Sequence, residues 1–108
     1  MTAIPEFDQA SDGASLRFVL GEQFRIRLKE NRTSGFRWRL EGDLASLLKL
    51  IAENYEPVSL QPGAGGVHTW DFQCVAQGLA TLVFAMSRSW ETGPPARRFS
   101  ITAEVTVP

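Results

Sequence analysis

Residues 23–40 read QFRIRLKENRTSGFRWRL, and this stretch decides the fold class. Apolar side chains occupy every second position over 23–29 and again over 36–40, with polar or charged side chains between them. A period of two is typical of β-strands that bury one face and expose the other. The segment 30–35 between the two runs is polar and ends in glycine, which is typical of a loop. The sequence therefore predicts two strands joined by a polar loop.

The same alternation recurs along the rest of the chain. It appears at 16–18, 69–74, 81–86 and 99–107. Turn sequences that contain glycine or proline lie between these runs, at 60–66, 76–78 and 87–96. Six or seven short strands in a chain of this length indicate an all-β fold, and we expect an antiparallel β-sandwich of about seven strands. A β-barrel is the main alternative.

One segment, GDLASLLKLIAENYEP at 42–57, fits two patterns. A possible helix cap, Asp43, precedes leucines and an isoleucine at helical spacing, namely Leu44, Leu47, Leu48 and Ile51. An outgoing strand is also consistent with the alternation of Leu48, Leu50 and Ala52. We expect a short helical turn near 44–47, followed by a strand near 50–55.

Charge and hydropathy exclude several classes of partner. The 108 residues carry 11 basic and 12 acidic side chains, so the net charge is −1. Nucleic-acid binding needs clustered excess positive charge, and we expect no such partner. No apolar run approaches the roughly 18 residues of a membrane span, and the N-terminus lacks the basic and then apolar pattern of a signal peptide. We expect one domain over residues 1–108, a monomer, and no membrane partner. The compartment stays open: cytoplasmic, or periplasmic or secreted if a signal sequence was removed.

The arginines and the single cysteine have structural interpretations. Alternating arginines at 25, 27, 37 and 39 predict a solvated sheet face paired with acidic side chains. Cys74 follows Trp70 and Phe72 at strand spacing, which predicts a small buried hydrophobe. The only histidine, His68, lies six positions earlier in the predicted strand, too far to activate the thiol, and we expect it at a loop edge or an interface. One histidine and one cysteine do not make a metal site, so neither an enzyme nor a cofactor is expected.

Three of the predicted loops form a recognisable set. The first reads NRTSGF and comprises Asn31, Arg32, Thr33, Ser34, Gly35 and Phe36. The second reads GAGG and comprises Gly63, Ala64, Gly65 and Gly66. The third reads RSW and comprises Arg88, Ser89 and Trp90. In this order the loops resemble the chagasin family, the immunoglobulin-like protein inhibitors of papain-type cysteine peptidases. That family has Asn-Pro-Thr-Thr-Gly-Tyr/Phe, Gly-x-Gly-Gly and Arg-Pro-Trp at the corresponding places.

The resemblance implies a reversible, tight-binding inhibitor of papain-like cysteine peptidases that inserts loops 31–36, 63–66 and 88–91 into and beside the active-site cleft. The first loop would be the central wedge, with short hydroxyl side chains at Thr33 and Ser34 and close backbone approach at Gly35. The second loop would be mobile before binding and would pair its backbone with an extended segment of the enzyme. Arg88 and Trp90 would contact the other side of the cleft, and Trp90 is expected to be partly exposed.

Two departures from the family pattern, Arg32 and Ser89, replace prolines. Loss of the fixed proline φ predicts a less rigid loop at each place and puts potency and target range in doubt. Alternatives remain for each loop: a self-capped polar turn, a flexible glycine connection, and a Trp90 that folds back over the end of the sandwich. The alternative function is a non-inhibitory β-sandwich module that binds a carbohydrate or a protein through the same loops. The other tryptophans, Trp38 and Trp70, lie inside predicted strands and are expected in the core.

Overall fold

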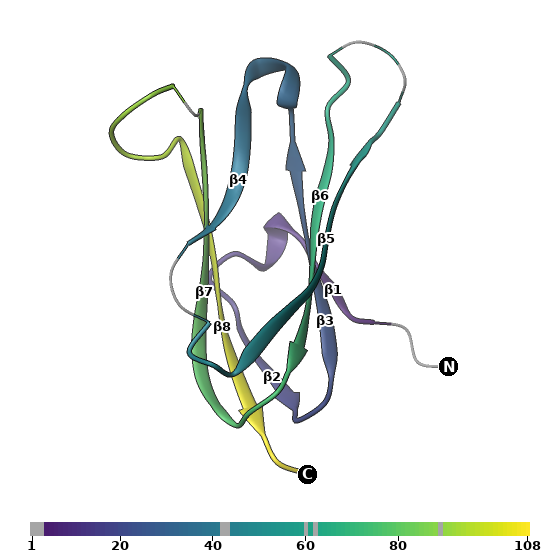
Figure 1. Ribbon diagram of the computed structural model, residues 1–108, viewed down its shortest axis with the longest axis vertical. Helices are drawn as coiled ribbons and strands as arrows, with labels where there is room; N and C mark the ends of the chain where they lie inside the picture. Colours follow the sequence, from purple (N-terminus) through teal and green to yellow (C-terminus); the bar gives the residue numbers. More distant parts are fainter. Residues whose placement is uncertain (1–3, 42–43, 60, 62, 89) are drawn as a thin grey trace.

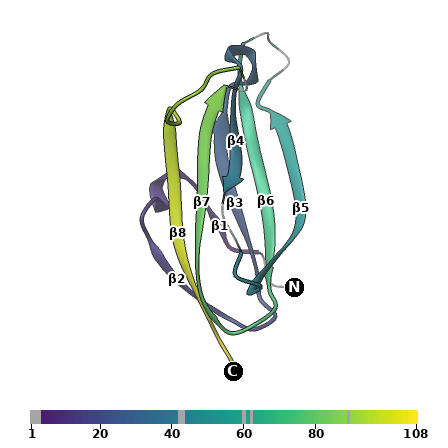
Figure 2. The same cartoon turned by 60° about the vertical axis from the view of Figure 1, so that its left-hand side comes forward.

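The computed structural model describes residues 4–41, 44–59, 61, 63–88 and 90–108. Two four-stranded sheets pack face to face, as Figures 1 and 2 show. The strands are β1 (Glu6–Phe7), β2 (Ser15–Val19), β3 (Gln23–Glu30), β4 (Phe36–Glu41), β5 (Leu48–Pro57), β6 (Gly66–Cys74), β7 (Gly78–Arg88) and β8 (Arg97–Thr106). Two single 3₁₀ turns, η1 (Gln9–Ser11) and η2 (Arg32–Ser34), complete the described elements. The predicted all-β sandwich is confirmed.

One sheet has the order β1-β3-β6-β5 and the other β2-β8-β7-β4. The pairs β3–β6, β5–β6, β4–β7 and β7–β8 are antiparallel, as predicted. The two N-terminal strands differ, because β1 pairs parallel with β3 and β2 pairs parallel with β8. A parallel pair needs a long connection, and between β2 and β8 that connection is most of the sandwich itself. Short-range alternation carries no information on such a pairing.

The core follows the predicted alternation. Inward positions of the long strands are almost fully buried, including Phe24, Ile26, Leu28, Trp70, Phe72, Leu82, Phe84, Phe99 and Ile101. Aromatic rings contact one another within and between the sheets, with ring centroids 5.3 Å apart for Phe24 and Phe72 of one sheet and 4.7 Å apart for Trp70 and Phe84 of opposite sheets. The predictions that Trp38, Trp70 and Cys74 are core residues are confirmed.

The segment before β5 does not contain the expected helical turn. Ala45 and Ser46 have left-handed φ values of 57° and 60°, and the Leu47 amide donates to the Leu44 carbonyl at 3.1 Å. The Leu47 carbonyl accepts a hydrogen bond from the Val75 amide at 2.8 Å, so this residue extends the pairing of β5 with β6 and does not belong to a helix. The proposed cap, Asp43, lies outside the described residues. The expected strand is confirmed and is longer, with a bulge between Leu50 and Ala52.

The four arginines of the predicted stripe lie on two different outer faces. Consecutive strands β3 and β4 belong to opposite sheets, so Arg25 and Arg27 face away from Arg37 and Arg39. Arg25 binds Asp71 at 2.6 Å and Glu6 at 3.2 Å, and Arg27 binds the same Glu6 at 3.2 Å. Within the described part of the chain, Arg37 and Arg39 form no ion pair. Pairing with acidic side chains is therefore confirmed for one half of the stripe and wrong for the other.

Candidate functional site

The three loops predicted to act together lie at the same end of the sandwich, opposite the C-terminus (Figure 1). The first joins β3 to β4, the second joins β5 to β6, and the third joins β7 to β8. The strands β3, β5 and β7 all end at this pole, and β4, β6 and β8 begin there. Figure 2 shows the same clustering from another side. The fold therefore brings together three segments that are about 25 to 30 residues apart along the chain.

The first loop is a compact turn and not an open hairpin. Residues 32–34 form η2, in which the Ser34 amide donates to the Asn31 carbonyl at 3.3 Å and the Gly35 amide donates to the Arg32 carbonyl at 3.0 Å. The Ser34 hydroxyl also donates to the Asn31 carbonyl at 2.8 Å. Gly35 then reverses the chain with φ of 85°, a left-handed value that favours glycine. The two carbonyls of Asn31 and Arg32 therefore accept hydrogen bonds from within the turn.

The second loop packs on the first. The Asn31 side-chain amide donates to the Gly63 carbonyl at 3.4 Å. A Cβ at Gly65 would lie 3.4 Å from the Glu30 carbonyl oxygen, so the backbones of the two loops approach closely there. Gly66 is not a loop residue, because it begins β6 and is buried. A Cβ on Gly66 would come within 2.6 Å of the Tyr55 ring and hydroxyl, so this glycine makes room for a tyrosine beneath the loops.

The third loop also contacts the first. The Arg88 Nε donates to the Ser34 carbonyl at 2.9 Å, and its guanidinium lies 4.2 Å from the centroid of the Phe36 ring. An ion pair of 3.0 Å joins Arg88 to Glu91. Trp90 is 67% exposed, which confirms the expectation of exposure. The edge of its ring still covers Gly35, where a Cβ would overlap Trp90 Cη2. Ser89 lies outside the described residues.

A buried ionic cluster lies beneath the first loop, where the sequence predicted none. The Glu30 side chain is fully buried, and its carboxylate accepts from Arg32 Nε at 2.7 Å and from the Trp38 amide at 2.5 Å. The same carboxylate lies 3.2 Å from His68 Nδ1. Burial alone would raise the pKa of Glu30, but the hydrogen bonds from Arg32, Trp38 and His68 outweigh it and hold that pKa below its ordinary value.

The expectation that His68 lies at a loop edge or an interface is wrong. The residue is only 5% exposed, and its ring stacks on Trp70 with centroids 3.8 Å apart. Its second ring nitrogen, Nε2, lies 2.7 Å from Glu53 Oε2. The sequence contains a signal for this burial. His68 lies an even number of positions from Trp70 and Cys74, and Glu30 lies two positions after Leu28, so each shares the inward face of its strand with buried residues. Two ionisable residues at inward positions of paired strands predict a buried pair.

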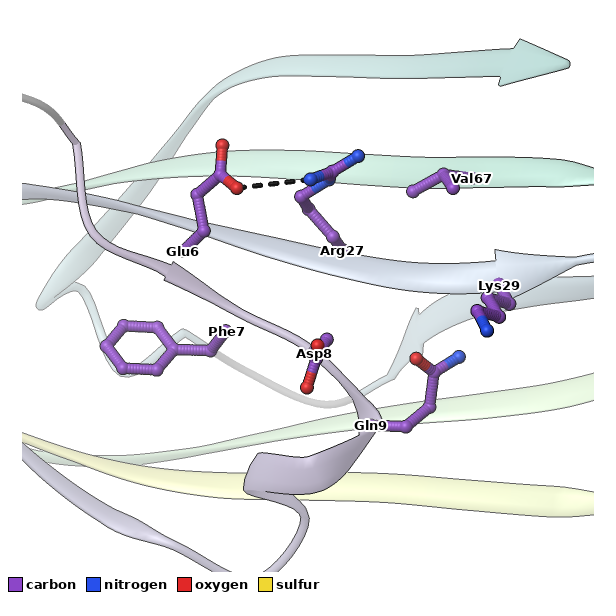
Figure 3. Close-up of a pocket in the computed structure, with 7 residues that line it drawn as sticks. All are labelled: Glu6, Phe7, Asp8, Gln9, Arg27, Lys29 and Val67. Carbon is purple, nitrogen blue, oxygen red and sulfur yellow. Dashed lines mark hydrogen bonds and ion pairs between the residues drawn. The ribbon is translucent and has the colours of Figure 1, made fainter. Parts of the chain in front are cut away.

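The other polar groups and the hollow beside β1 do not indicate a catalytic or metal site. Among the described residues no group of three or more histidine, cysteine or acidic side chains could hold a metal ion, and no helix could cross a membrane. Burial, followed by the charge of Glu22, raises the pKa of the Cys74 thiol, which favours an inert core cysteine. A hollow of about 280 Å³ lies beside β1. Figure 3 shows the residues that line it, among them the ion pair of Arg27 and Glu6. None of its lining residues belongs to the three loops.

A second hollow, of about 440 Å³, opens between the first and second loops. Its lining residues are Lys29, Glu30, Asn31, Val58, Ala64, Gly65, Gly66, Val67 and Met86. The loop end therefore presents the η2 turn between an exposed tryptophan on one side and an open, partly apolar depression on the other.

Comparison of the sequence and the structure with known proteins identifies the family. The model of the chagasin family of peptidase inhibitors, I42, matches residues 17–105. Chagasin from Trypanosoma cruzi is 31% identical over 100 residues, which are 86% of this chain and 90% of the relative. The crystal structure of a cysteine protease inhibitor from Entamoeba histolytica has a TM-score of 0.83 at 22% identity and covers 95% of this chain and 96% of its own.

A third similarity comes from a complex. The inhibitor PbICP-C, solved in complex with falcipain-2, has a TM-score of 0.65 at 13% identity, with 98% of this chain and 96% of that chain covered. At this identity the likeness shows the shared fold. Together with the family model and the Trypanosoma cruzi relative, it leads to one conclusion: the chain belongs to the chagasin family of peptidase inhibitors, whose members inhibit peptidases and are not enzymes.

Proposed function

We propose that this protein is a reversible, tight-binding inhibitor of papain-like cysteine peptidases and that it acts through residues 31–36, 63–66 and 88–91. The observation that carries the proposal is the convergence of the three family loops at one pole, where they contact one another directly. A papain-like enzyme has an extended cleft with a thiolate–imidazolium pair at its centre. The loop end offers a central turn with a further loop on each side of it.

The first loop would enter the cleft as a closed turn. A substrate of a papain-like enzyme binds in an extended conformation, with its scissile bond open to the thiolate. Residues 32–34 instead form a 3₁₀ turn whose flanking carbonyls are engaged by internal hydrogen bonds. Such a turn can fill the cleft without presenting an extended peptide bond for attack, which fits inhibition without cleavage.

The flanking loops would supply most of the contact energy. Arg and Trp side chains are the types most enriched at binding hot spots. Trp90 is largely exposed, and Arg88 supports the first loop while it keeps a third of its side chain exposed. On the other flank, Ala64 is exposed and lines the hollow between the loops together with Gly65, so a segment of the enzyme can approach the second loop there.

Titration of papain with the purified protein, followed with a fluorogenic peptide substrate, tests the proposal. We expect stoichiometric, reversible loss of activity at nanomolar concentrations, equivalent to about −12 kcal/mol of binding free energy. Trp90→Ala should weaken inhibition by about 2 kcal/mol. Leu79→Ala is the matched control, since Leu79 is 66% exposed but lies on β7 near the opposite end. No inhibition of papain or of a cathepsin-type enzyme up to tens of micromolar would contradict the proposal.

A further inference from the structure

Arg32 carries the positive charge nearest the tip of the first loop, yet its side chain turns back towards the sandwich. Its Nε lies 2.7 Å from Glu30 Oε2, and its guanidinium carbon lies 3.9 Å from the centroid of the Tyr55 ring. Only 34% of the side chain is exposed. The guanidinium is thus held between a buried carboxylate and an aromatic face, a geometry that the planar Arg head suits well.

Glu30 connects this arginine to both sheets. It ends β3 of one sheet, and its Oε1 accepts from the amide of Trp38 in β4 of the other sheet. The same oxygen faces His68 of β6, and the Trp38 indole donates to the Lys29 carbonyl at 2.9 Å. The carboxylate therefore fixes the two strands that carry the first loop at the point where the chain passes from one sheet to the other.

Tyr55 completes the enclosure of Arg32 from the side of β5. Its hydroxyl lies 3.4 Å from the Glu30 carbonyl, and its ring occupies the space that the absent side chain of Gly66 leaves free. The Arg32 side chain therefore has two described partners within the protein, the Glu30 carboxylate and the Tyr55 ring. A side chain held in this way can control the loop's direction without touching a partner.

We propose that Arg32 is a positioning residue, which fixes the inhibitory loop by its contacts with Glu30 and Tyr55. The proposal rests on the inhibitor function proposed above. It replaces the expectation that Arg32 loosens the loop. The rival interpretation is that Arg32 swings outward and binds an acidic group of the peptidase directly.

Variants of Arg32 and its buried partner separate the two interpretations. Glu30→Gln keeps the size of a side chain that is fully buried and cannot reach a peptidase. If Arg32 acts through Glu30, Arg32→Ala and Glu30→Gln should each raise the inhibition constant for papain roughly tenfold, and the double variant should add at most about twofold more. If Arg32 binds the enzyme, Glu30→Gln should leave the inhibition constant unchanged and the two effects should add, which would overturn the proposal.

Amide hydrogen exchange of the free protein gives a readout that does not depend on any peptidase. The amides of Ser34 and Gly35 close the η2 turn, so they should exchange roughly tenfold faster in Arg32→Ala and in Glu30→Gln, with partial recovery in Arg32→Lys. Arg17→Ala, which breaks the exposed 3.0 Å ion pair with Glu104 on the outer surface, is the control and should change neither readout. If the Ser34 and Gly35 amides exchange at the same rate in Arg32→Ala as in the unmodified protein, the positioning role is refuted. This test does not need Glu30→Gln and therefore holds even where that variant does not fold. Failure of the unmodified protein to inhibit would refute the proposed function alone, and the exchange result would still decide the role of Arg32.

Discussion

Replacement of Gly35 by alanine tests how the first and third loops are connected. Gly35 has φ of 85°, and a Cβ there would overlap Cη2 of Trp90 and lie 2.9 Å from its Cζ3. The left-handed backbone costs an L-residue about 1–2 kcal/mol. The steric overlap adds a second effect, because the Trp90 ring must leave its place over the loop.

Gly13→Ala provides a matched control for the backbone cost. Gly13 has φ of 82°, nearly the same as Gly35, but a Cβ added there would meet none of the described heavy atoms beyond its chain neighbours within 4 Å. Both variants should therefore lose about 1–2 kcal/mol of unfolding free energy, which urea titration measures. Only Gly35→Ala should displace Trp90 and raise the inhibition constant for papain, by roughly tenfold or more.

Acrylamide quenching of tryptophan fluorescence follows the ring itself. Of the three tryptophans, Trp38 and Trp70 are buried in the core and Trp90 is exposed, so a change in quenching reports on Trp90. The reasoning is refuted if Gly13→Ala weakens inhibition as much as Gly35→Ala, or if Gly35→Ala leaves both quenching and inhibition unchanged.

The buried groups and the exposed tryptophan give three more expected outcomes. The pKa of Glu30 is lowered in the folded state, so the ionised carboxylate contributes to the free energy of unfolding above the ordinary pKa of 4.5. This contribution is lost as the pH falls through the lowered folded pKa. In an acid titration Glu30→Gln should therefore lose less unfolding free energy below pH 4.5 than the unmodified protein. The Cys74 thiol, 1% exposed and with a raised pKa, should react with a thiol reagent only when the protein is unfolded, and rapid reaction of the folded protein would contradict its core position. Trp90→Ala should leave the free energy of unfolding within about 0.5 kcal/mol of the unmodified protein while it weakens inhibition, and a large loss of stability would mean that the ring is a structural cap.

The strands could be predicted from the sequence because each long strand buries one face. In β3 and β6 the inward residues alternate without interruption, and the periodicity identified both. Parallel pairing of β2 with β8 could not be predicted, since it depends on which distant strand reaches the sheet edge. The left-handed turn at Ala45 and Ser46 could not be predicted either, because the leucines around it fit a helix equally well. Leu47 lies against Val75 and Gly78, which are distant in sequence, and these contacts favour the turn.

The loops of the candidate site were predicted from their order and motifs, but their mutual support was not. Arg88 was predicted as a contact for a partner, and the structure adds a hydrogen bond to the Ser34 carbonyl. The polarity of 30–35 predicts a loop position for Glu30, whereas the residue ends β3 and its side chain is fully buried. Its parity with Leu28 on the inward face, and the matching parity of His68, were the local signals that would have identified it.

Each hydrogen bond described between two of the loops joins a side-chain donor to a backbone carbonyl. Carbonyl oxygens of Ser34 and Gly63 accept the hydrogen bonds that join one loop to another, and glycines supply the clearance. Among the described contacts, exposed positions such as Ala64 and Thr92 carry none of these connections. Substitutions at such positions can therefore change which peptidase is bound while the hydrogen bonds between the loops are kept. A library randomised at Ala64 and Thr92 should yield inhibitors with altered selectivity among cysteine peptidases and with the parent's thermal stability.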